Sequence, residues 1–222
     1  MGLHGLAYRV RATLKPNRSY EEPFRHALEN TVKPGDTVWD VGANVGIYTE
    51  LFCKWVGPQG NVVAFEPNPE PIARIKDRIK DCPWLTLENV ALGARDERST
   101  LIVENGYTVS GHVQYNGETD NSGKLAIPIQ LTTGDKVCGR IGKSPNVVKV
   151  DVEGFEEDVL LGLDHTLLSP LVRAVLIEVH FQQLESRGES KAPIRIQEFL
   201  RSKGFRLKWI DANHLLAERP VG

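Results

Sequence analysis

Residues 40–46 read Asp40-Val41-Gly42-Ala43-Asn44-Val45-Gly46. The run Thr37-Val38-Trp39 before them is β-branched and aromatic, and residues 47–52 after them read as the first turns of a helix. A strand, a glycine loop and a helix N-terminus form a common binding site for nucleotide-type cofactors. The glycines allow a ligand to approach the backbone, and the helix N-terminus offers unpaired N–H groups to an anion. The stretch therefore predicts a cofactor site on an α/β sheet.

The spacing of this loop differs from the dinucleotide fingerprint Gly-x-Gly-x-x-Gly. Asp40 stands two residues before the first glycine, where a carboxylate repels a pyrophosphate but attracts an ammonium or a sulfonium. S-adenosylmethionine carries both of these cations, together with a carboxylate that suits the helix end. We therefore predict that Asp40, Gly42, Asn44 and Gly46 bind S-adenosylmethionine.

The composition is that of an ordinary globular protein, with 41% hydrophobic and 25% charged residues, and we expect one domain over residues 1–222. A net charge of −2 gives no basic field for nucleic acid. The three cysteines are odd in number and lack a Cys-x-x-Cys pair, which predicts no disulfide framework, no zinc site and a reducing, cytoplasmic location. No apolar run reaches the ~18 residues that a membrane span needs.

Predicted strands and helices alternate, which indicates an α/β fold with a mostly parallel sheet covered on both faces. We expect helices at 20–31, 46–56, 67–81, 155–161 and 193–203, and parallel strands at 36–41, 61–66, 85–90, 146–151 and 172–179. Segments 205–210 and 214–218 predict a C-terminal antiparallel hairpin. Residues 1–35 form a lead-in and a helix, and residues 104–145, polar and glycine-rich over 106–124, are expected to be an insertion or substrate cover.

Polar residues follow the predicted strands at their carboxyl ends, which is the edge where open α/β sheets bind ligands. Glu66 ends the second strand, and its carboxylate can accept both ribose hydroxyls; capping the helix after Pro67 is the alternative role. Asn89 and Val90 end the third strand and are expected near the adenine. Asp151 ends the fourth strand and is a further candidate for cofactor binding.

A second set of polar residues is expected beside the cofactor. Lys149, Asp151 and Glu153 share one face of the fourth strand if that strand continues to Glu153, and Glu178 and His180 share one face of the fifth. We predict that Glu153, Glu178 and His180 bind the acceptor. His180, with an unperturbed pKa near ~6.5, is the first candidate for the base that takes the acceptor proton.

Two alternatives remain open for this second set. Lys149 with Asp151 is a second candidate for the catalytic base, but the lysine is also explained by a structural ion pair with Asp151 or Glu178. The carboxylates and His180 could also hold a magnesium ion. We predict no metal, because Lys149 would repel the ion.

Five blocks of sequence together resemble the FkbM-type methyltransferases: residues 40–46, 65–67, 89–93, 149–156 and 177–180. The resemblance spans about residues 20–220. It implies a Rossmann-like class I methyltransferase fold, S-adenosylmethionine as cofactor, and O-methylation of polyketides, sugars or related metabolites. Two positions depart from the family pattern: Phe155 stands where a histidine is usual, and Leu131-Thr132-Thr133-Gly134-Asp135 replaces a Thr-Leu-Asp pattern.

The sequence thus predicts an O-methyltransferase that acts on a hydroxyl of a small-molecule acceptor, such as a polyketide, a sugar or a glycolipid. It leaves a homodimer open. A nicotinamide-dependent oxidoreductase is one alternative, disfavoured because Asn44 occupies a glycine position of the fingerprint. A non-catalytic module that retains the cofactor pocket is the other.

Overall fold

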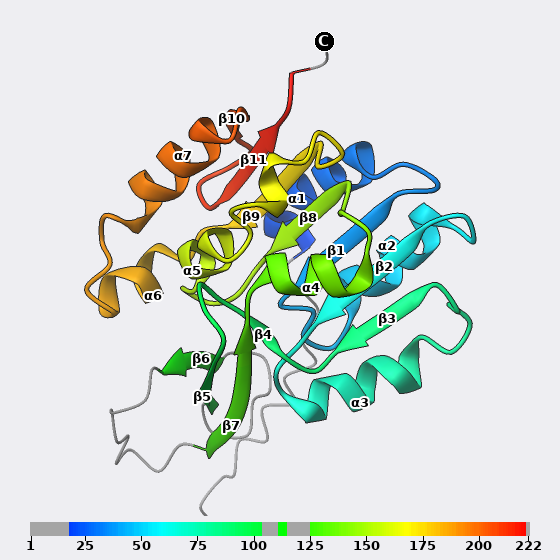
Figure 1. The fold of residues 1–222 in the computed structure, drawn as a ribbon, viewed down its shortest axis with the longest axis horizontal. Helices are drawn as coiled ribbons and strands as arrows, with labels where there is room; N and C mark the ends of the chain where they lie inside the picture. Colours follow the sequence, from blue (N-terminus) through cyan, green and yellow to red (C-terminus); the bar gives the residue numbers. More distant parts are fainter. Residues whose placement is uncertain (1–17, 104–110, 115–124, 221–222) are drawn as a thin grey trace, which may run out of the picture.

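A seven-stranded sheet forms the centre of the computed structural model, which describes residues 18–103, 111–114 and 125–220 (Figure 1). The strand order across this sheet is β10-β11-β9-β8-β1-β2-β3. The strands are β1 (Thr37–Val41), β2 (Asn61–Phe65), β3 (Leu85–Glu88), β8 (Val147–Val150), β9 (Ala174–Glu178), β10 (Arg206–Trp209) and β11 (His214–Glu218).

Parallel pairing joins β3, β2, β1, β8 and β9, whereas β11 is antiparallel to β9 and to β10. The chain turns between β10 and β11 at Asp211, whose Oδ1 accepts the N–H groups of Asn213 and His214 at 2.9 Å each. The predicted mostly parallel sheet with a C-terminal antiparallel hairpin is confirmed. The hairpin folds back so that β11 lies inside the sheet and β10 forms its edge.

Helices cover both faces of this sheet. As a result, every residue of β1 and β8 is buried and neither strand has a face for water. On one face, α1 and α2 pack around Phe24, Leu28 and Phe52. On the other, α4, α5 and α7 bury Val159 and Leu200. The helices are α1 (Arg18–Thr31), α2 (Ile47–Val56), α3 (Pro69–Arg78), α4 (Gly134–Ile141), α5 (Glu156–Leu161), α6 (Phe181–Ser186) and α7 (Ala192–Ser202).

A second, four-stranded sheet lies beside the carboxyl ends of the main strands, in the order β4-β7-β5-β6 (Figure 1). Its strands are β4 (Ala91–Leu92), β5 (Glu97–Val103), β6 (Gly111–Gln114) and β7 (Leu125–Thr132). The expected insertion at 104–145 is therefore more regular than predicted where it is described. The proposed cover at 106–124 lies outside the described residues except for β6, as does the lead-in before Arg18.

The helix α4 was missed by the sequence prediction, although its start carries a clear signal. Thr133 is the N-cap, and its hydroxyl accepts the N–H of Lys136 at 3.2 Å. The carboxylate of Asp135 accepts the N–H groups of His165 and Thr166. The departure from the family pattern at 131–135 thus forms the end of β7 and a capped helix start.

Cys53 and Cys82 form a single disulfide between α2 and the segment before β3, which the prediction of no disulfide framework did not anticipate. An odd count excludes a fully paired framework, but it does not exclude one bridge between two cysteines that packing brings together. Trp84 shows the same packing, since its Nε1 donates to the Cys53 carbonyl at 3.0 Å. Cys138 is free. The cysteines therefore no longer indicate a reducing compartment.

None of the helices in the described part of the chain combines the length and hydropathy that a bilayer crossing requires.

Candidate active site

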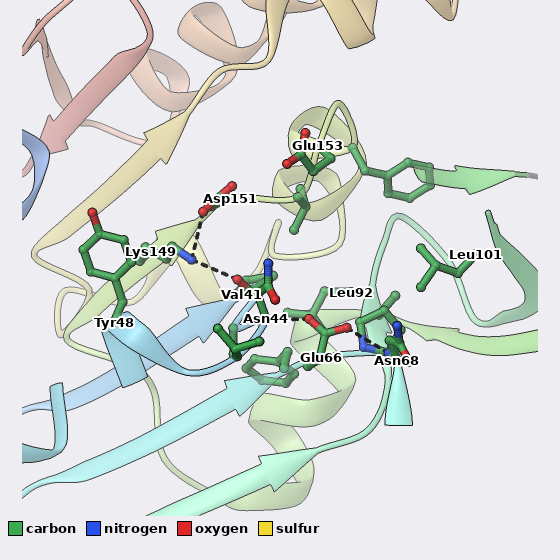
Figure 2. A pocket seen from close by; sticks show the side chains of 18 of the residues that line it. Val41, Asn44, Tyr48, Glu66, Asn68, Leu92, Leu101, Lys149, Asp151 and Glu153 are labelled. Carbon is green, nitrogen blue, oxygen red and sulfur yellow. Dashed lines mark hydrogen bonds and ion pairs between the residues drawn. The ribbon is translucent and has the colours of Figure 1, made fainter. Parts of the chain in front are cut away.

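A cavity of about 540 Å³ opens at the carboxyl ends of β1, β2, β8 and β9 (Figure 2). This volume lies within the range of roughly 300–1,000 Å³ that is usual for small-molecule sites. The glycine loop at 42–45 forms one side and residues 65–68 a second, while Val90, Leu92 and β5 supply an apolar wall. Residues 151–153 with Glu178 and His180 form an acidic end.

Lys149 reaches the cavity from β8 as a buried ammonium group. Its Nζ lies 3.0 Å from Asp40 Oδ1 and 3.3 Å from Asp151 Oδ2, and it donates to the Gly42 carbonyl at 2.9 Å. Asp40 is fully buried, accepts the Thr49 hydroxyl at 2.6 Å and does not line the cavity. The structure thus corrects the predicted direct attraction between Asp40 and a cofactor cation: Asp40 holds Lys149 and the start of α2, and Asp151 is the carboxylate beside Lys149 that faces the cavity (Figure 2).

The glycines of the loop are required by packing against neighbouring elements. Gly42 has φ +79°, and a Cβ there would overlap the backbone carbonyl of Asp151. Gly46 has φ +80° and does not line the cavity; a Cβ there would lie 2.9 Å from Ile75 of α3. The sequence predicts that the glycines allow a ligand to approach the backbone; at Gly42 the close neighbour is instead the backbone after β8.

Glu66 joins the two loops that border the cavity (Figure 2). Its Oε2 accepts the N–H of Asn44 at 2.9 Å, and its Oε1 accepts the N–H of Asn68 at 2.8 Å. The N-cap of α3 is Asn68, so Glu66 does not cap that helix itself. Burial raises the pKa of Glu66 to about 7, although the two backbone hydrogen bonds and Lys149 oppose the rise. Its carboxylate is fixed at the cavity wall, where the predicted ribose contact would need it.

Asn89 and Val90 have different places. Asn89 Nδ2 donates to the carbonyls of Glu66 and Pro67, at 2.9 and 3.0 Å, so Asn89 supports the loop from outside the cavity. Val90 lines the cavity. The predicted third strand ends early, at Glu88, and the chain then crosses to β4 of the second sheet.

Three carboxylates surround Nε2 of His180, and we call Asp151, Glu153, Glu178 and His180 the His180 cluster. Nε2 of His180 lies 3.7 Å from Asp151 Oδ1, 3.5 Å from Glu153 Oε2 and 3.8 Å from Glu178 Oε1. Strand alternation does not explain this grouping, because β8 ends at Val150. Glu153 and the following Gly154 have positive φ angles of 52° and 91°, and this turn leads from the end of β8 into α5.

The pKa values of His180 and Lys149 are both raised above their ordinary values. Burial lowers the pKa of His180, but its hydrogen bond to Glu156 and the charges of Asp151, Glu156 and Glu153 raise it to about 9. The imidazole is therefore protonated at neutral pH, above the unperturbed value near ~6.5 from which the sequence prediction started. Burial also opposes the charge of Lys149, yet Asp40 and Asp151 raise its pKa above the ordinary lysine value. Lys149 stays an ammonium group and is a poor base.

The sequence reasoning gave no role to Glu156, although it lies in one of the five blocks. Glu156 is fully buried at the start of α5, and its Oε1 lies 2.8 Å from His180 Nδ1. The signal that could have found it is the spacing to Val159 and Leu160, three and four positions later, which places Glu156 on the same face of the helix as these apolar residues. A carboxylate buried on that face needs a partner.

Asp151, Glu178 and His180 each place one ligand-type atom within 4.8 Å of the others. Two cationic groups oppose a metal ion here: Lys149, 3.3 Å from Asp151, and the protonated His180. The absence of a metal stays a prediction.

The glycine loop, the buried carboxylate of Glu66 and the cavity lie at the carboxyl ends of parallel strands. Together they define an α/β protein with a nucleotide-type cofactor site. The "Methyltransferase FkbM domain" model matches residues 40–207, about three quarters of the chain. The chain therefore belongs to the FkbM methyltransferase domain family of class I S-adenosylmethionine-dependent methyltransferases. S-adenosylmethionine is its cofactor, which removes the nicotinamide alternative.

Similar proteins show the same family. The hexuronic acid methyltransferase AglP of Haloferax volcanii is 32% identical over 165 residues, 73% of this chain and 63% of AglP, so this chain spans just under two thirds of AglP. The 31-O-demethyl-FK506 methyltransferase FkbM of Streptomyces tacrolimicus is 29% identical, over 71% of this chain and 69% of that protein. The crystal structure of the methyltransferase FkbM from Methylobacillus flagellatus has a TM-score of 0.54 at 16% identity, covering 82% of this chain and 43% of that one. At this identity the last likeness shows the fold alone.

Proposed function

We propose that this protein transfers a methyl group from S-adenosylmethionine to a hydroxyl of a small-molecule metabolite, such as a polyketide, a sugar or a glycolipid. One observation carries the proposal: the glycine loop with Glu66 and the His180 cluster open into the same cavity. The names of two relatives, which act on a hexuronic acid and on demethyl-FK506, support this class of acceptor.

The donor set of the cavity fits the cofactor. Glu66 would accept the ribose hydroxyls, and the apolar wall with Val90 suits an adenine ring. Asp151 offers a carboxylate to the cationic methionine part, beside the backbone of Gly42 and Asn44. The carboxylate of Glu66 holds the two loops together, which supports a cofactor site with a fixed wall.

The bound cofactor supplies a methyl group on a sulfonium, which is a good leaving group. The chain has to hold the acceptor oxygen in line with that methyl group and to take its proton. The His180 cluster would do both. With His180 as the base, turnover should rise as pH approaches about 9, where the imidazole loses its proton.

The carboxylate of Glu153 is the second candidate for the base. Burial and the neighbouring carboxylates raise its pKa, although His180 opposes the rise. With Glu153 as base, turnover should show no rise near the His180 pKa of about 9, and His180→Gln should remain active. A pH–rate profile of the native protein and of His180→Gln separates the two candidates.

The proposed function is tested by incubation with methyl-labelled S-adenosylmethionine and a panel of sugars, glycolipids and polyketides. We expect a product heavier by one methyl group, with the label on oxygen, and the same rate after treatment with a chelator. Label on nitrogen or carbon would contradict O-methylation. No transfer to any acceptor, with cofactor binding intact, would favour the non-catalytic module. Loss of transfer in chelator that magnesium restores would contradict the predicted absence of a metal.

A further inference from the structure

Glu156 connects the buried start of α5 to the acidic end of the cavity. Its side chain is fully buried, and its Oε1 accepts the N–H of Gly154 at 2.8 Å. The same oxygen lies 2.8 Å from His180 Nδ1. Because an ionised carboxylate can only accept hydrogen bonds, Nδ1 of His180 must be the donor in this contact.

This contact fixes where the other ring nitrogen points. With Nδ1 bound to α5, Nε2 of His180 is directed toward Asp151, Glu153 and Glu178, at 3.5–3.8 Å from their carboxylate oxygens. These distances exceed those of ordinary N–H···O hydrogen bonds, so Nε2 is held among the three acids without being bound tightly to any of them. The side chain of His180 is only 10% exposed, and Glu156 is its closest carboxylate.

We propose that Glu156 is the positioning residue of this site, holding the His180 imidazole so that Nε2 faces the acceptor. The inference rests on the proposed function, which places the acceptor hydroxyl at the His180 cluster. It extends that function by assigning the orientation of His180 to a buried carboxylate of α5, behind the imidazole and away from the cavity.

Two variants separate the charge of Glu156 from its hydrogen bond. Glu156→Gln keeps an oxygen for Nδ1–H and for the N–H of Gly154 but removes the negative charge. Glu156→Leu removes both. Glu157→Gln is the matched control, because Glu157 is the next residue of α5 and pairs with Arg195, outside the cavity.

The first measurement is an NMR titration of the His180 ring nitrogens in the ligand-free protein. The charges that face His180 come from Glu156 on α5, Asp151 and Glu153 after β8, and Glu178 on β9, which also lies 3.5 Å from His214 of β11. Removing one of these charges in Glu156→Gln should lower the His180 pKa by about 1–3. Glu157→Gln should leave it unchanged.

The second measurement is steady-state methyl transfer. Glu156→Leu should lower kcat by roughly 10- to 100-fold, since a displacement on the order of 1 Å at a reacting group has an effect of this size. Its KM for S-adenosylmethionine should stay near the native value, because Glu156 does not line the cavity.

An unchanged His180 titration in Glu156→Gln would overturn the proposal, as would a native kcat in Glu156→Leu. A parallel rise of KM for the cofactor would also overturn it, because it would indicate a general loss of structure. The titration requires no acceptor. It therefore decides the contact between Glu156 and His180 even if methyl transfer to hydroxyls is not found.

Discussion

His180 links the chemistry of the site to the stability of the protein. Because its pKa is raised from 6.5 to about 9, the folded protein keeps a proton that the unfolded chain releases. The stability from this proton is fully present below pH 6.5 and is lost as the pH rises through about 9. We expect a loss on the order of 2–3 kcal/mol between about pH 6 and pH 10, measured by urea unfolding.

The variant His180→Gln provides the comparison, since it cannot bind this proton. Its free energy of unfolding should fall less over the same pH range than that of the native protein. Equal losses in both proteins would show that His180 is not held as a cation in the fold.

Gly42 lies where the loop after β1 meets the backbone after β8. Gly42→Ala would place a methyl group against the Asp151 carbonyl and a non-glycine residue at φ +79°. Gly35→Ala is a matched control, because Gly35 has φ +86° but no atom near its hypothetical Cβ. The backbone conformation alone costs about 1–2 kcal/mol, which both variants should show. Denaturant unfolding should reveal a larger loss of unfolding free energy for Gly42→Ala. Equal losses in the two variants would mean that the close contact between Gly42 and the Asp151 carbonyl does not exist.

At the scale of elements, the disulfide ties α2 to the segment before β3. It closes a loop across a sequence separation of 29, which should contribute about 2–4 kcal/mol. Cys53→Ser should lower the free energy of unfolding by this amount, and Cys138→Ser should leave it nearly unchanged. Thiol titration of the unfolded, non-reduced protein should find one reactive thiol, Cys138. Three reactive thiols would show that the bridge is not formed.

The order of the main elements could be predicted because each carries a local signal. The central parallel strands are rich in apolar residues, interrupted by Asp40 in β1 and Lys149 in β8. Glycine or proline separates β1, β2 and β8 from the helices that follow them. The second sheet carries no such signal, since β4 has two residues and β5, β6 and β7 are defined by pairing between distant segments. The sequence therefore indicated an insertion at 104–145 without showing that β4–β7 form a sheet against the cavity.

The sequence predicts where the candidate site residues lie in the fold better than it predicts which partners their side chains contact. The rule that ligands bind at the carboxyl ends of parallel strands located Glu66, Asp151, Glu178 and His180. Which partner each side chain takes depends on register. Asp40 and Lys149 are direct neighbours across β1 and β8, and this pairing turns Asp40 away from the ligand toward the lysine. No local pattern contains that information.

At the scale of the whole molecule, two halves of the chain contribute residues to one cavity. The loop at 42–45 follows β1 and Glu66 follows β2, whereas the His180 cluster lies at the ends of β8 and β9. Loss of the Glu66 carboxylate should weaken cofactor binding, because hydrogen bonds to a charged group are worth about 1.5–3 kcal/mol each, or roughly ten- to a hundredfold in affinity.

Calorimetric titration with S-adenosylmethionine tests this central claim most directly. We expect one binding event for the native protein, an affinity at least about tenfold weaker for Glu66→Gln, and native affinity for Glu70→Gln. Glu70 is a matched control, since it lies four residues further along the chain, pairs with Arg74 and does not line the cavity. Absence of binding to the native protein, or equal affinity in Glu66→Gln, would contradict the assignment of this cavity as the cofactor site.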